Sequence, residues 1–392
     1  MSQQQINRND DLKKLQRDGY EVAIKSGHLI LHNVPYVNEK KEVKHGALVS
    51  VLEVNGDNTV PPTDHKAFYI GDHPCDKDGN KLRHIEHTSN RQQLCEGLVI
   101  DHSFSSKPKE GYKDYHHKMT TYVDMISRHA RAIDPSATAQ TYVVIESGDS
   151  ESVFNYSDSA STRAGIAAIT NKLKLNKVAI IGLGGTGSYV LDLIAKTPIQ
   201  EIHLFDGDDF LQHNAFKCPG APTLEKIRGR IKKVEYLANI YSQMHKNIIP
   251  HPVYINEHNT NLLNGMNFVF LCIDTGEAKK PIVIKLEANN TSFVDVGMGI
   301  NIINDKLIGI ARVTANTPEK RDHFRSHVGF TESGDNNAYS TNIQIADLNA
   351  LNATLAVIKW KKMFGFYADF ENEHSSNYTI DGNLITNLDK IS

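Results

Sequence analysis

The sequence of 392 residues has few cysteines, no long apolar run and no excess of charge of one sign. Its four cysteines, Cys75, Cys95, Cys218 and Cys272, are scattered and form no CxxC pair, which argues against a zinc knuckle or a disulfide framework. Basic and acidic residues number 43 and 46, so we expect no nucleic-acid and no membrane partner. Because no signal peptide or membrane span is predicted, we expect a cytoplasmic protein.

The most informative stretch, residues 176–217, predicts a nucleotide-binding βαβ unit. An apolar run at 178–181 leads directly into a glycine turn, and helix-spaced apolar residues and a second apolar run at 202–205 follow. In such a unit the first glycine permits a tight turn, the second a close approach to phosphate, and the third the packing of helix on strand. The glycines of this turn are Gly182, Gly184, Gly185 and Gly187.

Three acidic residues are expected where predicted strands end. Asp206 ends the second strand, where a carboxylate can accept a hydrogen bond from a ribose hydroxyl, and Asp208 and Asp274 lie at strand ends as well. The carboxyl ends of strands in an open α/β sheet face the ligand crevice. Three carboxylates there would repel a pyrophosphate unless a divalent cation intervened, which favours Mg–ATP over NAD. An NAD-dependent oxidoreductase stays an alternative on the glycine motif alone.

Composition divides the chain into two predicted domains. Short apolar runs, turn residues and one amphipathic helix at 115–133 indicate a smaller α+β domain over residues 1–145. A linker rich in Ser, Asp and Glu is predicted at 146–162. Alternating strands and helices over residues 163–392 predict a Rossmann-like α/β domain, with a mainly parallel sheet covered by helices on both faces.

Within the second domain we predict further elements that the structure can test. Continuous helices are expected at 163–173, 224–245 and 342–364, and a hairpin turning at Asn304-Asp305. The pattern from Thr341 to Gln344 indicates a capping box at the head of the last helix.

The glycine turn and the acidic and basic residues that follow it resemble those of the ThiF-type adenylyltransferases. This superfamily includes the enzymes that activate ubiquitin and ubiquitin-like proteins. The shared pattern is GxGGxG, DxD, a later Asn, a basic residue and a strand-ending Asp, over about residues 163–366. The order of the two domains also resembles a bacterial subgroup of this superfamily with an extra N-terminal domain. The residues that match the pattern are Gly182, Gly184, Gly185, Gly187, Asp206, Asp208, Asn214, Lys217 and Asp274.

The resemblance implies an activity, cofactors and partners. ATP and Mg²⁺ would be used to adenylate the C-terminal glycine of a ubiquitin-like or sulfur-carrier protein, giving an acyl-adenylate and pyrophosphate. The N-terminal domain would recruit that protein or a downstream carrier enzyme, and the chain would form a homodimer.

The resemblance also implies roles for single residues. Asp274 would hold Mg²⁺, and Lys217 stands where the superfamily usually has an arginine, whose planar fork a lysine lacks. Lys233 fits a phosphate-contacting lysine, with Lys232 or Arg230 as alternatives. Arg163 resembles an arginine that reaches the phosphates, in homodimers from the other subunit.

The chain departs from many relatives by having no cysteine after Cys272. The reaction can stop at the acyl-adenylate, or the acyl group can pass to Cys75 or Cys95. It can also form an oxyester on a loop hydroxyl that His323 or His327 activates. Lys217 and the missing cysteine also leave a nucleotide-binding pseudoenzyme as an alternative. The hydroxyl candidates are Ser326, Thr331, Ser333, Ser340 and Thr341, of which Ser340 is preferred because the capping box accounts for Thr341.

Overall fold

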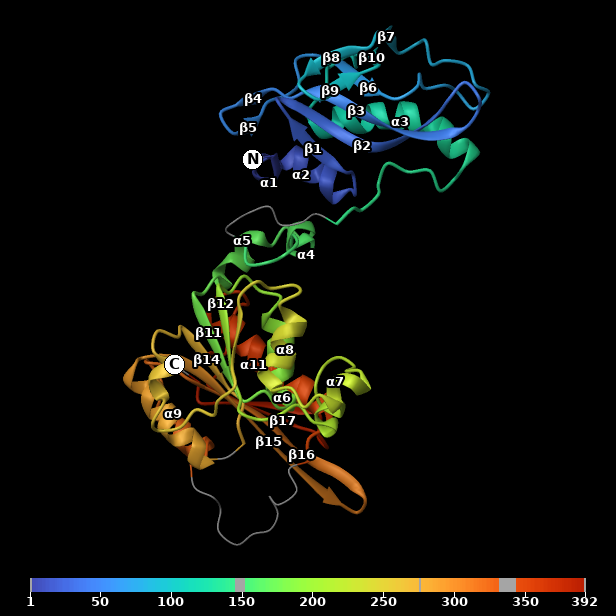
Figure 1. Ribbon diagram of the computed structural model, residues 1–392. Helices are drawn as coiled ribbons and strands as arrows, with labels where there is room; N and C mark the ends of the chain where they lie inside the picture. Colours follow the sequence, from blue (N-terminus) through green and yellow to red (C-terminus); the bar gives the residue numbers. More distant parts are fainter. Residues whose placement is uncertain (1, 145–151, 275, 331–342, 391–392) are drawn as a thin grey trace. The chain divides into compact units, whose positions relative to one another are not determined.

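The computed structural model describes residues 2–144, 152–274, 276–330 and 343–390 (Figure 1). The chain divides into two compact units, Met1–Glu151 and Ser152–Ser392. Among the described residues, no helix combines the length and the apolar character that a membrane span requires.

The first unit is built on a six-stranded antiparallel sheet with the strand order β1-β2-β3-β6-β10-β7. Two short hairpins, β4–β5 and β8–β9, stand outside this sheet. The strands are β1 (Val22–Lys25), β2 (His28–Val37), β3 (Val43–Val51), β4 (Val54–Asn55), β5 (Asn58–Thr59), β6 (Lys66–Ile70), β7 (Glu86–Thr88), β8 (Gln92–Cys95), β9 (Leu98–Ile100) and β10 (His102–Ser105). The helices are α1 (Ser2–Arg8), α2 (Asp10–Arg17) and α3 (Tyr115–Ile133).

Helix α3 confirms the helix predicted from periodic apolar residues. Its N-terminus is capped by Asp114, whose side chain accepts from the backbone N–H of His117 at 2.7 Å. The buried stripe of α3 packs against one face of the sheet, in one hydrophobic cluster with α2. The opposite face is covered by the β8–β9 hairpin, through Leu98 and Ile100. The smaller α+β domain is therefore confirmed.

Helix α3 also buries a lysine in this unit. The ammonium of Lys118, which is 1% exposed, donates at 2.8 Å to the Ser50 hydroxyl and at 2.8 Å to the Asp64 backbone carbonyl. Both acceptors are neutral oxygens, so they offset the desolvation of the charge only in part. Burial lowers the pKa of Lys118 from 10.5 to about 8.

The second unit is an eight-stranded mixed sheet with the order β13-β12-β11-β14-β15-β16-β17-β18. The first five strands in this order run parallel, and the last three add antiparallel pairs. The strands are β11 (Lys177–Ile181), β12 (Glu201–Phe205), β13 (Ile248–His251), β14 (Phe268–Leu271), β15 (Ser292–Ile303), β16 (Lys306–Asn316), β17 (Ser375–Thr379) and β18 (Leu384–Leu388). The predicted hairpin is confirmed between β15 and β16, where Asn304 and Asp305 have φ of 49° and 56°.

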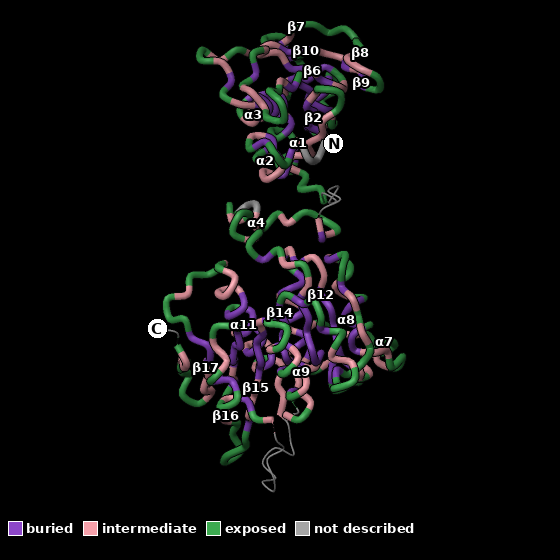
Figure 2. Tube along the Cα trace, turned by 90° about the vertical axis from the view of Figure 1, so that its left-hand side faces the viewer, coloured by how far each residue is buried: buried purple, intermediate pink, exposed green. Residues whose placement is uncertain are grey.

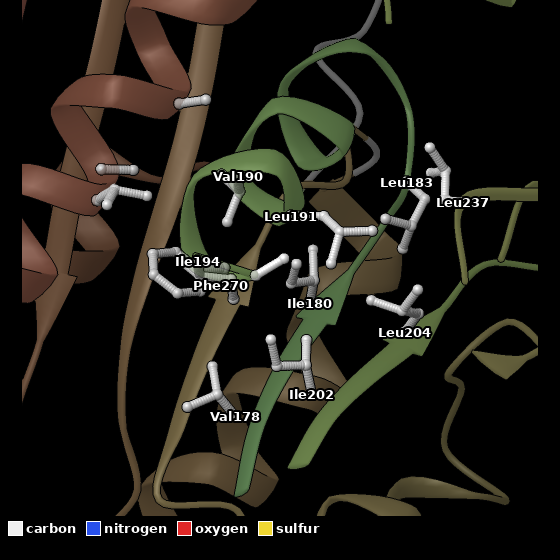
Figure 3. Packing of buried hydrophobic residues seen from close by; sticks show 14 of the residues in the cluster. Val178, Ile180, Leu183, Val190, Leu191, Ile194, Ile202, Leu204, Leu237 and Phe270 are labelled. Atoms are coloured by element: carbon white, nitrogen blue, oxygen red, sulfur yellow. The ribbon is translucent and has the colours of Figure 1, made fainter. Parts of the chain in front are cut away.

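Helices cover both faces of the parallel half of this sheet, which confirms the predicted Rossmann-like architecture (Figures 1 and 2). Along β11, Val178 and Ile180 pack against α6 and α11, as Figure 3 shows for α6, whereas Ala179 and Ile181 join α9 on the other face. The helices are α4 (Ser159–Arg163), α5 (Ala167–Thr170), α6 (Gly185–Ile194), α7 (Leu224–Arg228), α8 (Lys233–Tyr241), α9 (Gly276–Ala288), α10 (Phe324–His327) and α11 (Ala346–Met363), with short 3-10 turns at Asn171–Leu173, Gln212–Phe216 and Thr260–Leu263.

Three predicted helix boundaries are wrong. The helix expected at 163–173 is broken at Gly165, which has a φ of 70°. The helix expected at 224–245 is divided between α7 and α8, because Arg230 takes a φ of 45° and Lys232 forms a β-bridge with Asp209. Helix α11 begins at Ala346, so Gln344 precedes the helix and the predicted capping box is wrong.

The glycine turn between β11 and α6 is shaped by close backbone approaches. Gly182 has a φ of 91°, and a Cβ there would lie 2.6 Å from the Cys272 carbonyl oxygen. A Cβ on Gly187 would lie 1.9 Å from the carbonyl oxygen of Gly182. By contrast, Gly184 has a φ of −72° and faces open space, with nothing within 4 Å of an added Cβ. The first and last glycines are therefore needed to build the turn, and Gly184 is not.

Gly187→Ala should lower the free energy of unfolding of the second unit by about 2–3 kcal/mol, because the backbone of Gly182 must move to admit the methyl group. Gly184→Ala, the matched control, should change it by less than about 1 kcal/mol. Urea unfolding can be followed by the fluorescence of Trp360, the single tryptophan of the chain, which is buried in this unit. Equal losses in the two variants would contradict this account of the turn.

Lys118 should make the stability of the first unit rise with pH. Its pKa is lower in the folded than in the unfolded chain, so between about pH 8 and 10.5 the unfolded chain binds more protons. Between about pH 7.5 and pH 10 the gain from this residue should be about 2 kcal/mol. Urea unfolding followed by circular dichroism at both pH values should show this gain in the wild type and not in Lys118→Met. An identical pH dependence of the two proteins would contradict it.

Candidate active site

The glycine turn is held to the end of β12 by one buried carboxylate. Asp206, which is 6% exposed, accepts from the backbone N–H of Leu183 at 2.7 Å through Oδ2 and from that of Asp208 at 2.9 Å through Oδ1. Both oxygens of the predicted ribose acceptor are thus bonded to backbone. The bonds fix the start of α6, where helix dipole and free N–H groups favour an anion.

A buried lysine lies beside both members of the acidic pair. The Nζ of Lys233, which is 8% exposed, lies 2.6 Å from Asp208 Oδ2 and 3.7 Å from Asp206 Oδ2. The Tyr254 hydroxyl also donates to Asp208. Partial burial would raise the pKa of Asp208, but the hydrogen bonds from Lys233 and Tyr254 outweigh it and lower that pKa. The predicted Lys233 therefore lies beside both predicted acids.

The two alternatives to Lys233 lie elsewhere. Lys232 donates at 2.9 Å to the Gly207 carbonyl and pairs at 2.7 Å with Asp209, with its side chain 40% exposed. Arg230 is exposed at the break between α7 and α8. Their positions favour Lys233 as the lysine of the site.

Asn214 and Lys217 lie after β12, within and directly after the 3-10 turn Gln212–Phe216. Asn214 is 1% exposed, and its Oδ1 accepts from the Leu211 backbone N–H at 2.8 Å, so it holds the loop after β12. The Lys217 side chain is half-buried and makes no hydrogen bond or ion pair with the residues that the structure describes. Its ammonium can therefore serve an anion. Neighbouring Cys218 is buried, which raises the pKa of its thiol.

Asp274 follows β14 and is exposed beside a cavity of about 40 Å³. The cavity lies between the start of α6, the end of β14, the middle of β15 and the approach to α11. Gln344 donates from Nε2 to Asp274 Oδ2 at 3.0 Å. An exposed carboxylate at a strand end, where phosphates and waters can complete the coordination, fits Mg²⁺.

A buried ionic triad below this edge was missed from the sequence. Asp295, which is 0% exposed, lies 2.6 Å from Lys279 Nζ and 2.6 Å from Arg312 Nη2. Asp295 pairs in register with Leu271 on β14. A lone acid within the apolar run 292–296 was the signal that could have found it. The triad places one carboxylate, on the strand next to β14, against two basic groups.

Several predicted residues fall outside this arrangement. The side chain of Arg163 and the hydroxyl candidates Ser340, Thr331, Ser333 and Thr341 lie outside the described residues. Ser326 donates to the His323 carbonyl at 2.6 Å, His323 Nε2 bonds to the Ala315 carbonyl at 2.9 Å, and His327 bonds to Asp389. The two histidines thus have structural partners.

Lys233→Ala should weaken ATP binding roughly tenfold or more, because two carboxylates would face the nucleotide without their cation. Lys232→Ala removes a neighbouring exposed lysine and should change affinity less than about threefold. Titration calorimetry with ATP, on variants whose circular dichroism matches the wild type, measures both. Equal effects of the two substitutions would contradict a distinct role for Lys233.

Two family models match this chain, one after the other. A model described as ThiF family matches residues 156–347, and one described as Domain of unknown function (DUF6791) matches residues 10–159. The tRNA threonylcarbamoyladenosine dehydratase of Haemophilus influenzae is 25% identical over 129 residues, 32% of this chain and 49% of that protein. Ubiquitin-like modifier-activating enzyme 5 of Drosophila mojavensis is 24% identical over 168 residues, 38% of this chain and 40% of that protein.

The chain thus spans about half or less of the length of these curated relatives. A crystal structure of E. coli MccB with AMPCPP and MccA aligns at 18% identity over 56% of this chain and 65% of that chain, with a TM-score of 0.46. The family match agrees with the glycine turn, the acidic strand ends and the mixed sheet. Residues 156–347 therefore form a ThiF-family domain, and residues 10–159 match a domain of unknown function.

Proposed function

We propose that this protein adenylates the C-terminal carboxylate of a ubiquitin-like or sulfur-carrier protein that ends in glycine, using ATP. The observation that carries the proposal is that the glycine turn and Asp274 line one cavity, while Lys233 lies beside Asp206 and Asp208 after the neighbouring strand β12. The relatives named as ubiquitin-like modifier-activating enzyme 5 support the substrate class.

In the proposed reaction a carboxylate oxygen of the substrate attacks the α-phosphorus of ATP. The new carbon–oxygen–phosphorus anhydride forms as the bond from the α-phosphorus to the bridging oxygen breaks, and pyrophosphate leaves with the electron pair. Lys217 and Lys233 would stabilise negative charge on the phosphates, together with the N-terminus of α6. Asp274 would hold Mg²⁺, which neutralises phosphate charge when it is bound.

The acceptor of the acyl group is proposed to be a hydroxyl or a partner protein. Burial raises the pKa of the thiols of Cys75, Cys218 and Cys272, which disfavours the thiolate that a nucleophile requires. Ser340 is our candidate for an oxyester, although it lies outside the described residues.

We further propose that the protein works as a cytoplasmic homodimer, with Arg163 reaching the phosphates of the partner subunit. The N-terminal domain would recruit the substrate protein or a downstream carrier enzyme. The fusion of this domain to a ThiF-family domain supports a recruiting role.

Exchange of labelled pyrophosphate into ATP tests the proposal directly. Exchange should require a ubiquitin-like protein with its terminal glycine, encoded near this gene. Asp274→Ala should reduce it about a hundredfold or more, because a metal-holding carboxylate is lost. Asp381→Ala, which removes an exposed aspartate from the turn between β17 and β18, should leave exchange unchanged.

The other outcomes separate the alternatives. ATP binding without exchange, in the presence of a folded partner, would overturn the proposal in favour of a nucleotide-binding pseudoenzyme. Tight binding of NAD in preference to ATP would favour the oxidoreductase.

A further inference from the structure

The cavity beside Asp274 contains an oriented amide whose oxygen has no hydrogen-bond donor among the residues that the structure describes. Asn352 of α11 is 1% exposed, and its Nδ2 donates to the Gly297 carbonyl of β15 at 3.1 Å. This bond fixes the amide, because turning it over would set two carbonyl oxygens against each other. The Asn352 Oδ1 is buried and has no partner among the described residues.

A second amide on the cavity wall has the same arrangement. Gln344 uses its Nε2 on Asp274, and its buried Oε1 also lacks a described partner. The Thr186 hydroxyl, on the same wall, is bonded to Asn349 Oδ1 at 3.1 Å. The cavity thus offers acceptor oxygens, and buried acceptors without donors cost free energy. Such oxygens pair with N–H or O–H donors, and the ionised phosphates of ATP supply neither.

We propose that Asn352 is a positioning residue, whose Oδ1 accepts a hydrogen bond from the backbone N–H of the substrate's terminal residue. The inference rests on the proposed adenylation. In a terminal glycine, one carbon separates this N–H from the carboxylate. The lining of the cavity includes Asn352 and, at the start of α6, Gly184 and Gly185. A residue bound between them has its N–H on the amide and its carboxylate at the anion-binding end of α6.

A pair of probes tests this bond without any change to the protein. Glycylglycyl-sulfamoyladenosine is a stable mimic of the acyl-adenylate, and its ester counterpart replaces the N–H of the terminal glycine with oxygen. The wild type should bind the amide probe roughly tenfold more tightly than the ester probe, as measured by calorimetry. Asn352→Ala should bind both equally, because the acceptor is gone. Asn289→Ala, an exposed amide at the end of α9, should keep the tenfold preference.

Three results would overturn the inference. They are equal binding of the two probes by the wild type, an undiminished preference in Asn352→Ala, and no binding of either probe by protein that binds ATP. Pyrophosphate exchange with the ubiquitin-like protein is measured separately. Normal exchange with equal probe binding would reject the role of Asn352 alone, whereas absent exchange would reject the proposed adenylation.

Discussion

The candidate site depends on two hydrogen bonds that the Asp206 carboxylate accepts from backbone N–H groups. These bonds join the glycine turn after β11 to the loop after β12, and so align the start of α6 with the carboxyl edge of the sheet. Backbone N–H donors are neutral and bring no counter-charge to a buried carboxylate. Lys233, 3.7 Å away, supplies the counter-charge and brings Asp208 into the same group. Turn, acids and lysine therefore form one interdependent unit.

The side chain of Lys233 is positioned by a break between two helices and not by one continuous helix. The chain leaves α7 at Gly229, passes through Arg230 in the left-handed region and pairs Lys232 with Asp209 before α8 begins. In a continuous helix, Lys232 would lack the extended backbone that its β-bridge with Asp209 requires. The break therefore sets Lys233 at the first position of α8, with its backbone N–H donating to the Asp208 carbonyl at 3.0 Å.

On the side of the cavity formed by α11, the polar side chains are amides and not charged groups. Helix α11 begins at Ala346, which leaves Gln344 in extended chain against Asp274. Asn349 and Asn352, one turn apart on the same helix, face the start of α6 and the middle of β15. Buried polar groups on a helix that packs on the sheet are costly unless paired, and within the described part of the chain Asn352 is paired through its Nδ2 alone.

The sequence by itself determined the two-domain α/β organisation, helix α3, the β15–β16 hairpin and the acidic strand ends of the site, because these are recorded in local periodicity, turn residues and glycine spacing. Only the tertiary structure decided where helices break, which lysine meets the acids, and that Asp295 forms a buried triad. At the division between α7 and α8, Lys232 pairs with Asp209, and ahead of α11 Gln344 bonds to Asp274, so both places involve contacts with distant segments. No local pattern encodes such contacts, because hydrogen bonds and ion pairs between distant residues are set by packing.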